Sequence, residues 1–149
     1  MASKEILSAS NNIMKEVEKL IKKIGGGTVS VGFMGGKYED GESVPGVAYQ
    51  NEFGLVTNNQ PPRPFFRRMI SSESPTWPDK ISKLIKTGKY TGNQILEMMG
   101  HDIEGALRQS ILDLQDPPLS PITIAKKGFS KPLIDTKLML NSVVSKVDK

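Results

Sequence analysis

The segments Ala48-Tyr-Gln-Asn-Glu-Phe-Gly54 and Pro61-Pro-Arg-Pro-Phe-Phe-Arg67, separated by a short polar loop, decide how the middle of this chain folds. The first segment is typical of a short helix that ends at a glycine. In the second segment, each proline fixes φ, removes a backbone N–H donor and favours an extended conformation in the residue before it. We therefore expect a stiff arm over residues 61–64 that cannot pair as a central strand.

The two phenylalanines at the end of this arm have two possible roles. Phe65 and Phe66, flanked by Arg63 and Arg67, carry the aromatic and guanidinium groups that dominate binding energies at protein interfaces. Large apolar side chains are, however, usually buried within their own fold. Both interpretations stay open from the sequence, as does the choice between strand and helix for these two residues.

The composition limits the classes of protein to which the chain can belong. Its 149 residues fit a single domain, residues 1–149, with an ordinary globular content of apolar and charged side chains. The lack of cysteine excludes disulfides, thiolate metal sites and cysteine nucleophiles. The chain has no apolar run long enough to span a membrane and no signal-peptide pattern at its N-terminus. We therefore expect a protein that assembles in a reducing cytoplasm.

The chain is basic, with a net charge of +4 and a pI near 9.3, which raises the alternative of a small nucleic-acid-binding protein. The lysines of the N-terminal segment alternate with glutamates, and the tightest basic group consists of Arg63, Arg67 and Arg68. Three phosphate contacts would give a log–log salt slope of only about −2.7, which is a weak and non-specific anchor. A mildly basic, solvated surface is therefore the favoured interpretation.

Apolar periodicity and capping residues predict the helices. Residues 4–24 form an amphipathic helix that ends at three glycines. Residues 91–114 form the longest central helix, in which Thr91 and Gln94 have the spacing of a capping box. Further helices are expected over residues 45–53, from 64 to before Pro75, over 78–87 and 121–127, and from a cap at Asp135 or Thr136 through residue 141.

Two segments alternate between apolar and polar side chains, as half-buried strands do. These are residues 28–34 and 143–147, and the glycine-rich stretch after the first of them predicts a turn or a loose hairpin. The predicted fold class is α+β, with a small antiparallel or mixed β-sheet packed against several helices. A long Pro-rich loop or arm is expected over residues 35–64.

The sequence carries no recognisable catalytic or metal-binding pattern. Both Gly-Lys pairs of the chain are followed by tyrosine, whereas a phosphate-binding loop needs serine or threonine there. His101 is the only histidine, and among its acidic neighbours only Glu104 shares its helical face. We interpret this pair as polar surface and expect no enzyme activity, no cofactor and no metal site.

Several segments, taken in their order along the chain, resemble one family of tailed-bacteriophage structural proteins. These are the small neck or tail-completion proteins, also described as virion-morphogenesis or head–tail joining proteins. The order of the segments is more specific than any single one of them. The family usually has a glycine after its Asp-Thr pair, where this chain has Lys137. The resembling residues are 47–54, 61–67, 100–111, 119–128 and 131–136, the last running on to 147.

The resemblance implies a non-enzymatic virion component at the head–tail junction, either a neck or tail-completion protein or a tail terminator. Such proteins form a ring of identical copies, a hexamer or a dodecamer, between the connector on the portal side and the tail tube or sheath. DNA passes through the lumen without sequence-specific binding, and no membrane takes part. The expected locations are the virion and, during assembly, the host cytoplasm. A non-virion assembly factor is the alternative.

The resembling segments also supply the residues that we expect to contact other subunits. Ordinary packing within the fold is the alternative for the two aromatic residues of the first segment. We expect Tyr49, Asn51, Glu52 and Phe53 to fix the base of the arm, and Arg63, Phe65, Phe66 and Arg67 to contact the next subunit or a tail partner, with Asp135 and Thr136 completing the set.

Overall fold

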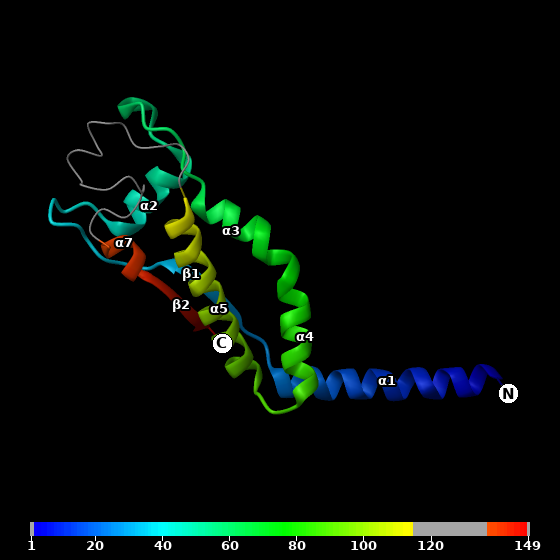
Figure 1. Ribbon diagram of the computed structural model, residues 1–149. Helices are drawn as coiled ribbons and strands as arrows, with labels where there is room; N and C mark the ends of the chain where they lie inside the picture. Colours follow the sequence, from blue (N-terminus) through cyan, green and yellow to red (C-terminus); the bar gives the residue numbers. More distant parts are fainter. Residues whose placement is uncertain (1, 115–136, 149) are drawn as a thin grey trace.

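The computed structural model describes residues 2–114 and 137–148, which form a mainly helical body with one long helix projecting from it (Figure 1). The helix predicted over 121–127 and the residues Asp135 and Thr136 lie outside the described residues. The elements follow in the order α1 (Ala2–Ile24), β1 (Thr28–Phe33), α2 (Val44–Phe53), the 3-10 turn η1 (Val56–Asn58), α3 (Phe65–Glu73), the 3-10 turn η2 (Ser74–Thr76), α4 (Trp77–Thr87), α5 (Gly92–Asp113), α7 (Leu138–Asn141) and β2 (Val143–Asp148).

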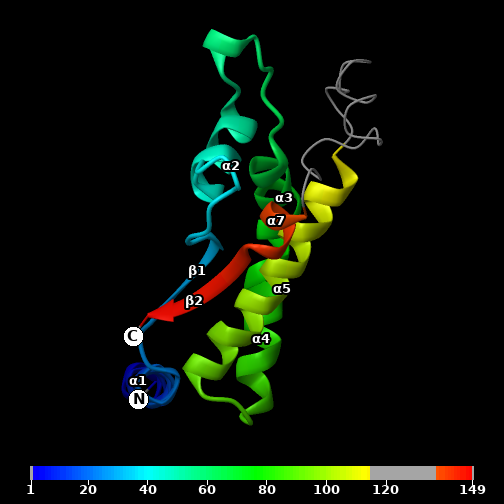
Figure 2. The same cartoon turned by 90° about the vertical axis from the view of Figure 1, so that its left-hand side faces the viewer.

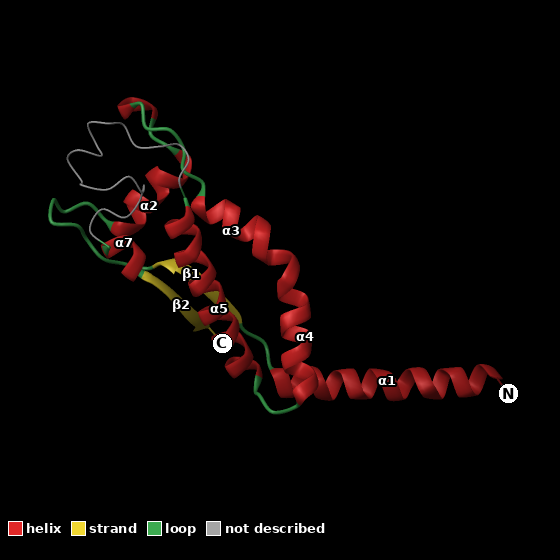
Figure 3. Ribbon diagram, viewed as in Figure 1, coloured by secondary structure: helices red, strands yellow, loops and turns green. Residues whose placement is uncertain are grey.

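The first and last strands of the described chain pair with each other. β1 and β2 form a two-stranded antiparallel sheet, whose register places Val29 opposite Val147 and Phe33 opposite Val143. One face of the sheet packs against α5, and α5 also contacts α3 and α4 (Figure 3). The predicted α+β class is therefore confirmed, and its sheet is antiparallel.

The longest helix of the body, α5, begins and packs as its sequence predicts. Thr91 Oγ1 accepts the backbone N–H of Gln94, and Gln94 Oε1 accepts the backbone N–H of Thr91, so the capping box is confirmed. The apolar stripe of α5 meets side chains from α2, α3, α7 and β2, and this contact forms the core. The buried apolar residues of the core are Val44, Ala48, Phe65, Met69, Ile103, Leu107, Ile111, Leu114, Met139 and Val143.

The segment around the prolines forms a shorter arm than expected. α2 ends at Gly54, and residues 55–60 fold back in a tight turn in which Leu55 pairs with Gln60. Pro64 is the residue before α3, so both phenylalanines lie in the first turn of a helix and not in a strand. Figure 2 shows the connection between α2 and α3 projecting at the end of the body opposite α1.

The start of the last short helix corrects one prediction. α7 begins at Leu138, and its N-cap is Lys137, whose side chain makes no capping hydrogen bond. The helix therefore does not begin at Asp135 or Thr136. Lys137 has a φ of 62°, in the left-handed region that L residues avoid because Cβ approaches the following carbonyl oxygen.

The projecting helix α1 confirms the prediction for residues 4–24 and begins two residues earlier. It leaves the body at a glycine turn, where Gly25 has a φ of 73°, and Lys23 Nζ donates to the carbonyl oxygen of Gly88 near its base. Its described apolar side chains are exposed to solvent along the whole helix. None of the described helices combines the length and the apolar character needed to cross a lipid bilayer.

Candidate subunit-contact surface

A buried carboxylate joins the end of α2 to the start of α3. Glu52 is 5% exposed, and its two carboxylate oxygens accept the backbone N–H groups of Phe66 and Arg67 at 2.9 and 3.1 Å. These amides belong to the first turn of α3 and have no partner within the helix, so Glu52 caps α3 from another element. A negative charge at this end is also favoured by the helix dipole.

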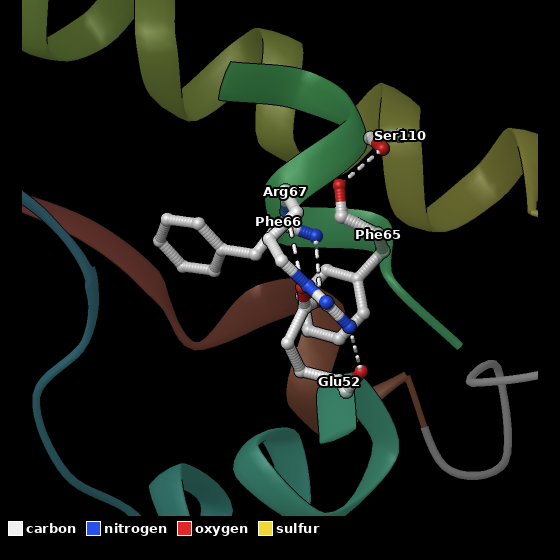
Figure 4. A network of polar contacts seen from close by, with 5 residues as sticks. All are labelled: Glu52, Phe65, Phe66, Arg67 and Ser110. Carbon is white, nitrogen blue, oxygen red and sulfur yellow. Dashed lines mark hydrogen bonds and ion pairs between the residues drawn. The ribbon is translucent and has the colours of Figure 1, made fainter. Parts of the chain in front are cut away.

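The same carboxylate fixes the side chain of Arg67. Arg67 Nε donates to Glu52 Oε1 at 2.7 Å, and Arg67 Nη2 donates to the backbone oxygen of Glu52 at 2.9 Å. Figure 4 shows the guanidinium group held across the end of α2 by these bonds. Because the backbone and the side chain of Arg67 are both bound to one residue, the position of its guanidinium group is fixed.

Two exposed aromatic side chains lie next to this guanidinium group. The guanidinium carbon of Arg67 lies 4.9 Å from the centre of the Phe53 ring, and the Phe53 and Tyr49 ring centres are 4.7 Å apart. Tyr49 is 64% exposed and Phe53 is 50% exposed. We call Tyr49, Phe53, Arg67 and the exposed Ile70 of α3 the aromatic platform.

A shallow apolar groove lies beside the platform. Its volume is about 360 Å³, and its floor is formed by the half-buried Phe33 and Phe66 and by the fully buried Phe65. Exposed apolar surface next to a fixed arginine has the composition that protein interfaces favour. The residues that line the groove are Phe33, Pro45, Ala48, Tyr49, Glu52, Phe53, Phe65, Phe66, Arg67 and Ile70.

Two of the four residues expected at the base of the arm, Asn51 and Glu52, make hydrogen bonds there. Asn51 Nδ2 donates to Val47 O, Asn51 Oδ1 accepts from Gln60, and Asn51 O accepts the N–H of Arg63, so this residue ties both ends of the loop together. Glu52 ties the end of α2 to the start of α3 in a similar way. Tyr49 and Phe53 lie on the same helix but point outward, away from the loop contacts that Asn51 makes.

The interface role predicted for Phe65 is wrong, because this side chain is 0% exposed. It lies in the core, and its backbone oxygen accepts a hydrogen bond from Ser110 Oγ of α5 at 2.6 Å (Figure 4). Phe66 is half-buried and meets Phe33 edge-on, with ring centres 6.5 Å apart. Within the first turn of α3, the Phe65 side chain therefore lies in the core and the Arg67 guanidinium group lies at the surface.

The basic group of Arg63, Arg67 and Arg68 does not form one freely exposed surface patch. Arg67 is paired with Glu52, and Arg63 is half-buried. Burial lowers the pKa of Arg63, and its Nε has no hydrogen-bond partner among the described residues. Arg68 alone of the three is exposed without such a constraint. This arrangement weakens the nucleic-acid alternative, which requires several guanidinium groups free to meet phosphates.

His101 and Glu104 differ in their burial. His101 is exposed, as predicted, but Glu104 is buried and lies 3.3 Å from Arg108 Nη2. Burial raises the pKa of Glu104, yet the hydrogen bonds from Ser145 and the charge of Arg108 lower it by more, so this pKa lies below its ordinary value. Arg108 also donates to Val143 O, so the group joins α5 to β2. In the described ranges no cluster of His, Asp or Glu could hold a metal ion.

Comparison of the chain with protein-family models, with curated proteins and with solved structures gives no match in any of the three. The role of the aromatic platform is therefore inferred from its own geometry. Sequence reasoning named Tyr49, Phe53 and Arg67 as contact residues but gave Ile70 no role at the surface. The apolar residues of α3 at positions 65, 66, 69 and 70 span an arc wider than one buried face, and this was the signal that one of them stays outside.

Proposed function

We propose that this chain is a structural protein of a tailed-phage virion, located at the head–tail junction, where identical copies form a ring between the connector and the tail. The observation that carries the proposal is the aromatic platform. Three of its four residues, Tyr49, Phe53 and Arg67, lie in two of the segments that resemble the neck and tail-completion family, residues 47–54 and 61–67. A neck adaptor and a tail terminator both need such a protomer, so the proposal covers both.

The platform has the physical properties of a subunit contact. Tyr49 and Phe53 present flat apolar area to solvent, and the buried Glu52 already holds Arg67 beside them. Binding of a partner therefore does not have to order a free arginine side chain, which would cost conformational entropy. In a ring, this surface would meet a different surface of the next copy, because head-to-tail contacts generate closed rings. DNA in the lumen would need no specific contact from these residues.

The position of Lys137 gives separate support. The family usually has a glycine after its Asp-Thr pair, and Lys137 adopts the left-handed φ that glycine adopts without strain. A glycine at this position in the family is compatible with the same backbone conformation. The agreement concerns the backbone and does not depend on the aromatic platform.

Immunogold labelling of this protein on purified virions tests the location. We expect gold at the junction of head and tail. Label absent from finished particles, with the protein present in infected cells, would overturn the virion role and favour an assembly factor.

Variants of the platform test the contact itself. Tyr49→Ala should leave the melting temperature of the isolated protein unchanged, because the side chain is mostly exposed, and should reduce the yield of complete particles in a complementation assay. Met98→Ala, which truncates an exposed side chain on α5, is the matched control and should keep the yield. Phe65→Ala should cost about 3–5 kcal/mol of folding stability, as expected for a core residue. Equal particle yields with Tyr49→Ala and Met98→Ala would contradict the assignment.

A further inference from the structure

The exposed face of α1 is the largest feature that the proposed contact surface leaves unused. Its described apolar side chains, Ile6, Leu7, Ile13, Met14, Val17 and Ile21, are between 40% and 69% exposed. Figures 1 and 3 show α1 extending away from the rest of the chain along most of its length. The 23 residues give a helix about 35 Å long, so an apolar stripe about 10 Å wide covers roughly 350 Å². A patch of this size lies in the range of the largest apolar patch on a typical monomer, which is often functional.

The spacing of these residues specifies the shape of the partner. Ile6 and Ile13 are seven residues apart, and so are Leu7, Met14 and Ile21. Leu20 continues the first series in the sequence. A strict seven-residue apolar repeat keeps one seam in contact with another helix that has the same repeat. Within the described part of the chain, α1 is the helix that presents such a repeat to solvent.

The polar face and the apolar composition argue against a lipid surface as the partner. Membrane-surface helices combine a polar face rich in Lys and Arg with Trp, Phe or Leu on the apolar side. The polar face of α1 carries three glutamates, Glu5, Glu16 and Glu18, among its lysines, and its apolar side has no aromatic residue. Charges of both signs are typical of a helix that lies among other helices in water.

The width of the stripe points to more than one neighbouring helix. Ile13 and Leu7 lie about 120° apart around the axis, at about 100° for each residue. This arc is wider than the narrow seam of a two-stranded coiled coil and matches a helix that faces a core. Each α1 could then contact two others at once.

We infer that α1 is a self-association element, and that the α1 helices of three or more copies of this chain pack through this stripe into a helical bundle. The glycines at residues 25 and 26, whose Cβ positions are open, let the helix adjust its angle to the body. The bundle would supply the association between copies that the proposed ring requires. It rests on the geometry of α1 and not on the location in a virion.

Sedimentation equilibrium of the full chain over a wide range of concentrations tests the bundle. We expect a mass of three protomers or more. Ile13→Glu should raise the dissociation constant about 100-fold or more, because it places an unpaired charge in an apolar seam. Asn12→Glu adds the same charge on the polar face and should leave the mass unchanged. Thermal unfolding of the body should be the same in both variants, because the Ile13 side chain is exposed in the single chain.

Helicity gives a second readout. Most of the stability of an amphipathic helix comes from the packing of its apolar face, so the circular dichroism at 222 nm should gain intensity with concentration in the wild type and in Asn12→Glu, but not in Ile13→Glu. A monomer at every concentration, a mass of only two protomers, or an oligomer that Ile13→Glu leaves intact would each overturn the inference. A monomeric chain whose virions still carry label at the head–tail junction would overturn the bundle and leave the proposed function standing.

Discussion

Glu52 and Arg67 are joined by three hydrogen bonds that connect two helices across the Pro-rich loop. Glu52 Oε1 accepts from the backbone N and from Nε of Arg67, and the backbone oxygen of Glu52 accepts from Nη2. The carboxylate is buried while the guanidinium group is half-exposed. The pair therefore has a buried end inside the protein and an exposed end at its surface.

Removal of this carboxylate should destabilise the protein. Glu52→Ala deletes the cap of α3 and the charge-assisted bonds to Arg67, and we expect a loss of about 2–3 kcal/mol in the free energy of unfolding. Glu52→Gln keeps one acceptor and should cost about 1 kcal/mol. Urea denaturation measures both. Glu97→Ala, at an exposed site on α5, should stay within about 0.5 kcal/mol of the wild type, and a Glu52→Ala effect no larger than this would disprove the capping role.

Two glycines of α5 should respond in opposite directions to the same substitution. A Cβ at Gly100 would lie 2.8 Å from Ser145 Oγ and 3.0 Å from Val29 Cγ2, so Gly100→Ala forces α5 away from the sheet. We expect a net destabilisation of about 1–3 kcal/mol, although alanine favours the helix. A Cβ at Gly105 meets nothing within 4 Å, so Gly105→Ala should stabilise by about 0.5–1 kcal/mol. Thermal or urea unfolding measures the stability change in each variant, and changes of the same sign would contradict the close packing at Gly100.

The sequence predicted best where the cause is local. The capping box at Thr91 and Gln94 and the glycine that ends α4 at Gly88 depend on neighbours within a few residues, and both are confirmed. The sequence also predicted a helix from residue 64, but not the cap of this helix, because the cap comes from Glu52 in another element.

Which apolar side chains are exposed depends on contacts between elements, and this could not be predicted from the local sequence. Amphipathic spacing predicted that α1 is a helix, but periodicity alone does not reveal whether the apolar face meets the body of the same chain. Phe65 and Phe66 are adjacent and chemically identical, and only the packing of α3 against α5 separates the buried ring from the half-buried one. The sequence therefore predicted the chemistry of the platform and not which of its aromatic residues remain outside.

Glu104 should make the stability depend on pH in the acidic range. Its pKa in the folded protein lies below the ordinary value, because the hydrogen bonds from Ser145 and the charge of Arg108 outweigh the effect of burial. The charged form therefore contributes stability above the unfolded-state pKa of about 4.3, and this contribution is lost as the pH falls through the folded-state pKa. Glu104→Gln removes the titration. The difference in unfolding free energy between wild type and Glu104→Gln should shrink as the pH falls from about 6 to about 3, and a constant difference would count against the coupling.

Lys137 holds a backbone conformation that suits glycine, and replacing it should stabilise the protein. Its φ of 62° costs an L residue about 1–2 kcal/mol, while glycine adopts it without a steric penalty but loses more entropy on folding. The net expectation for Lys137→Gly is a gain of about 0.5–1 kcal/mol, measured by urea unfolding.

Two further substitutions separate backbone strain from the loss of a charge at this site. Lys137→Ala removes the same ammonium group but keeps Cβ, so it should give none of the gain. Asn59, the other described non-glycine residue with positive φ, is of a type that tolerates this region, and Asn59→Gly should change stability less than Lys137→Gly does. If Lys137→Ala stabilises as much as Lys137→Gly, the gain comes from removal of the charge and not from relief of backbone strain at this position.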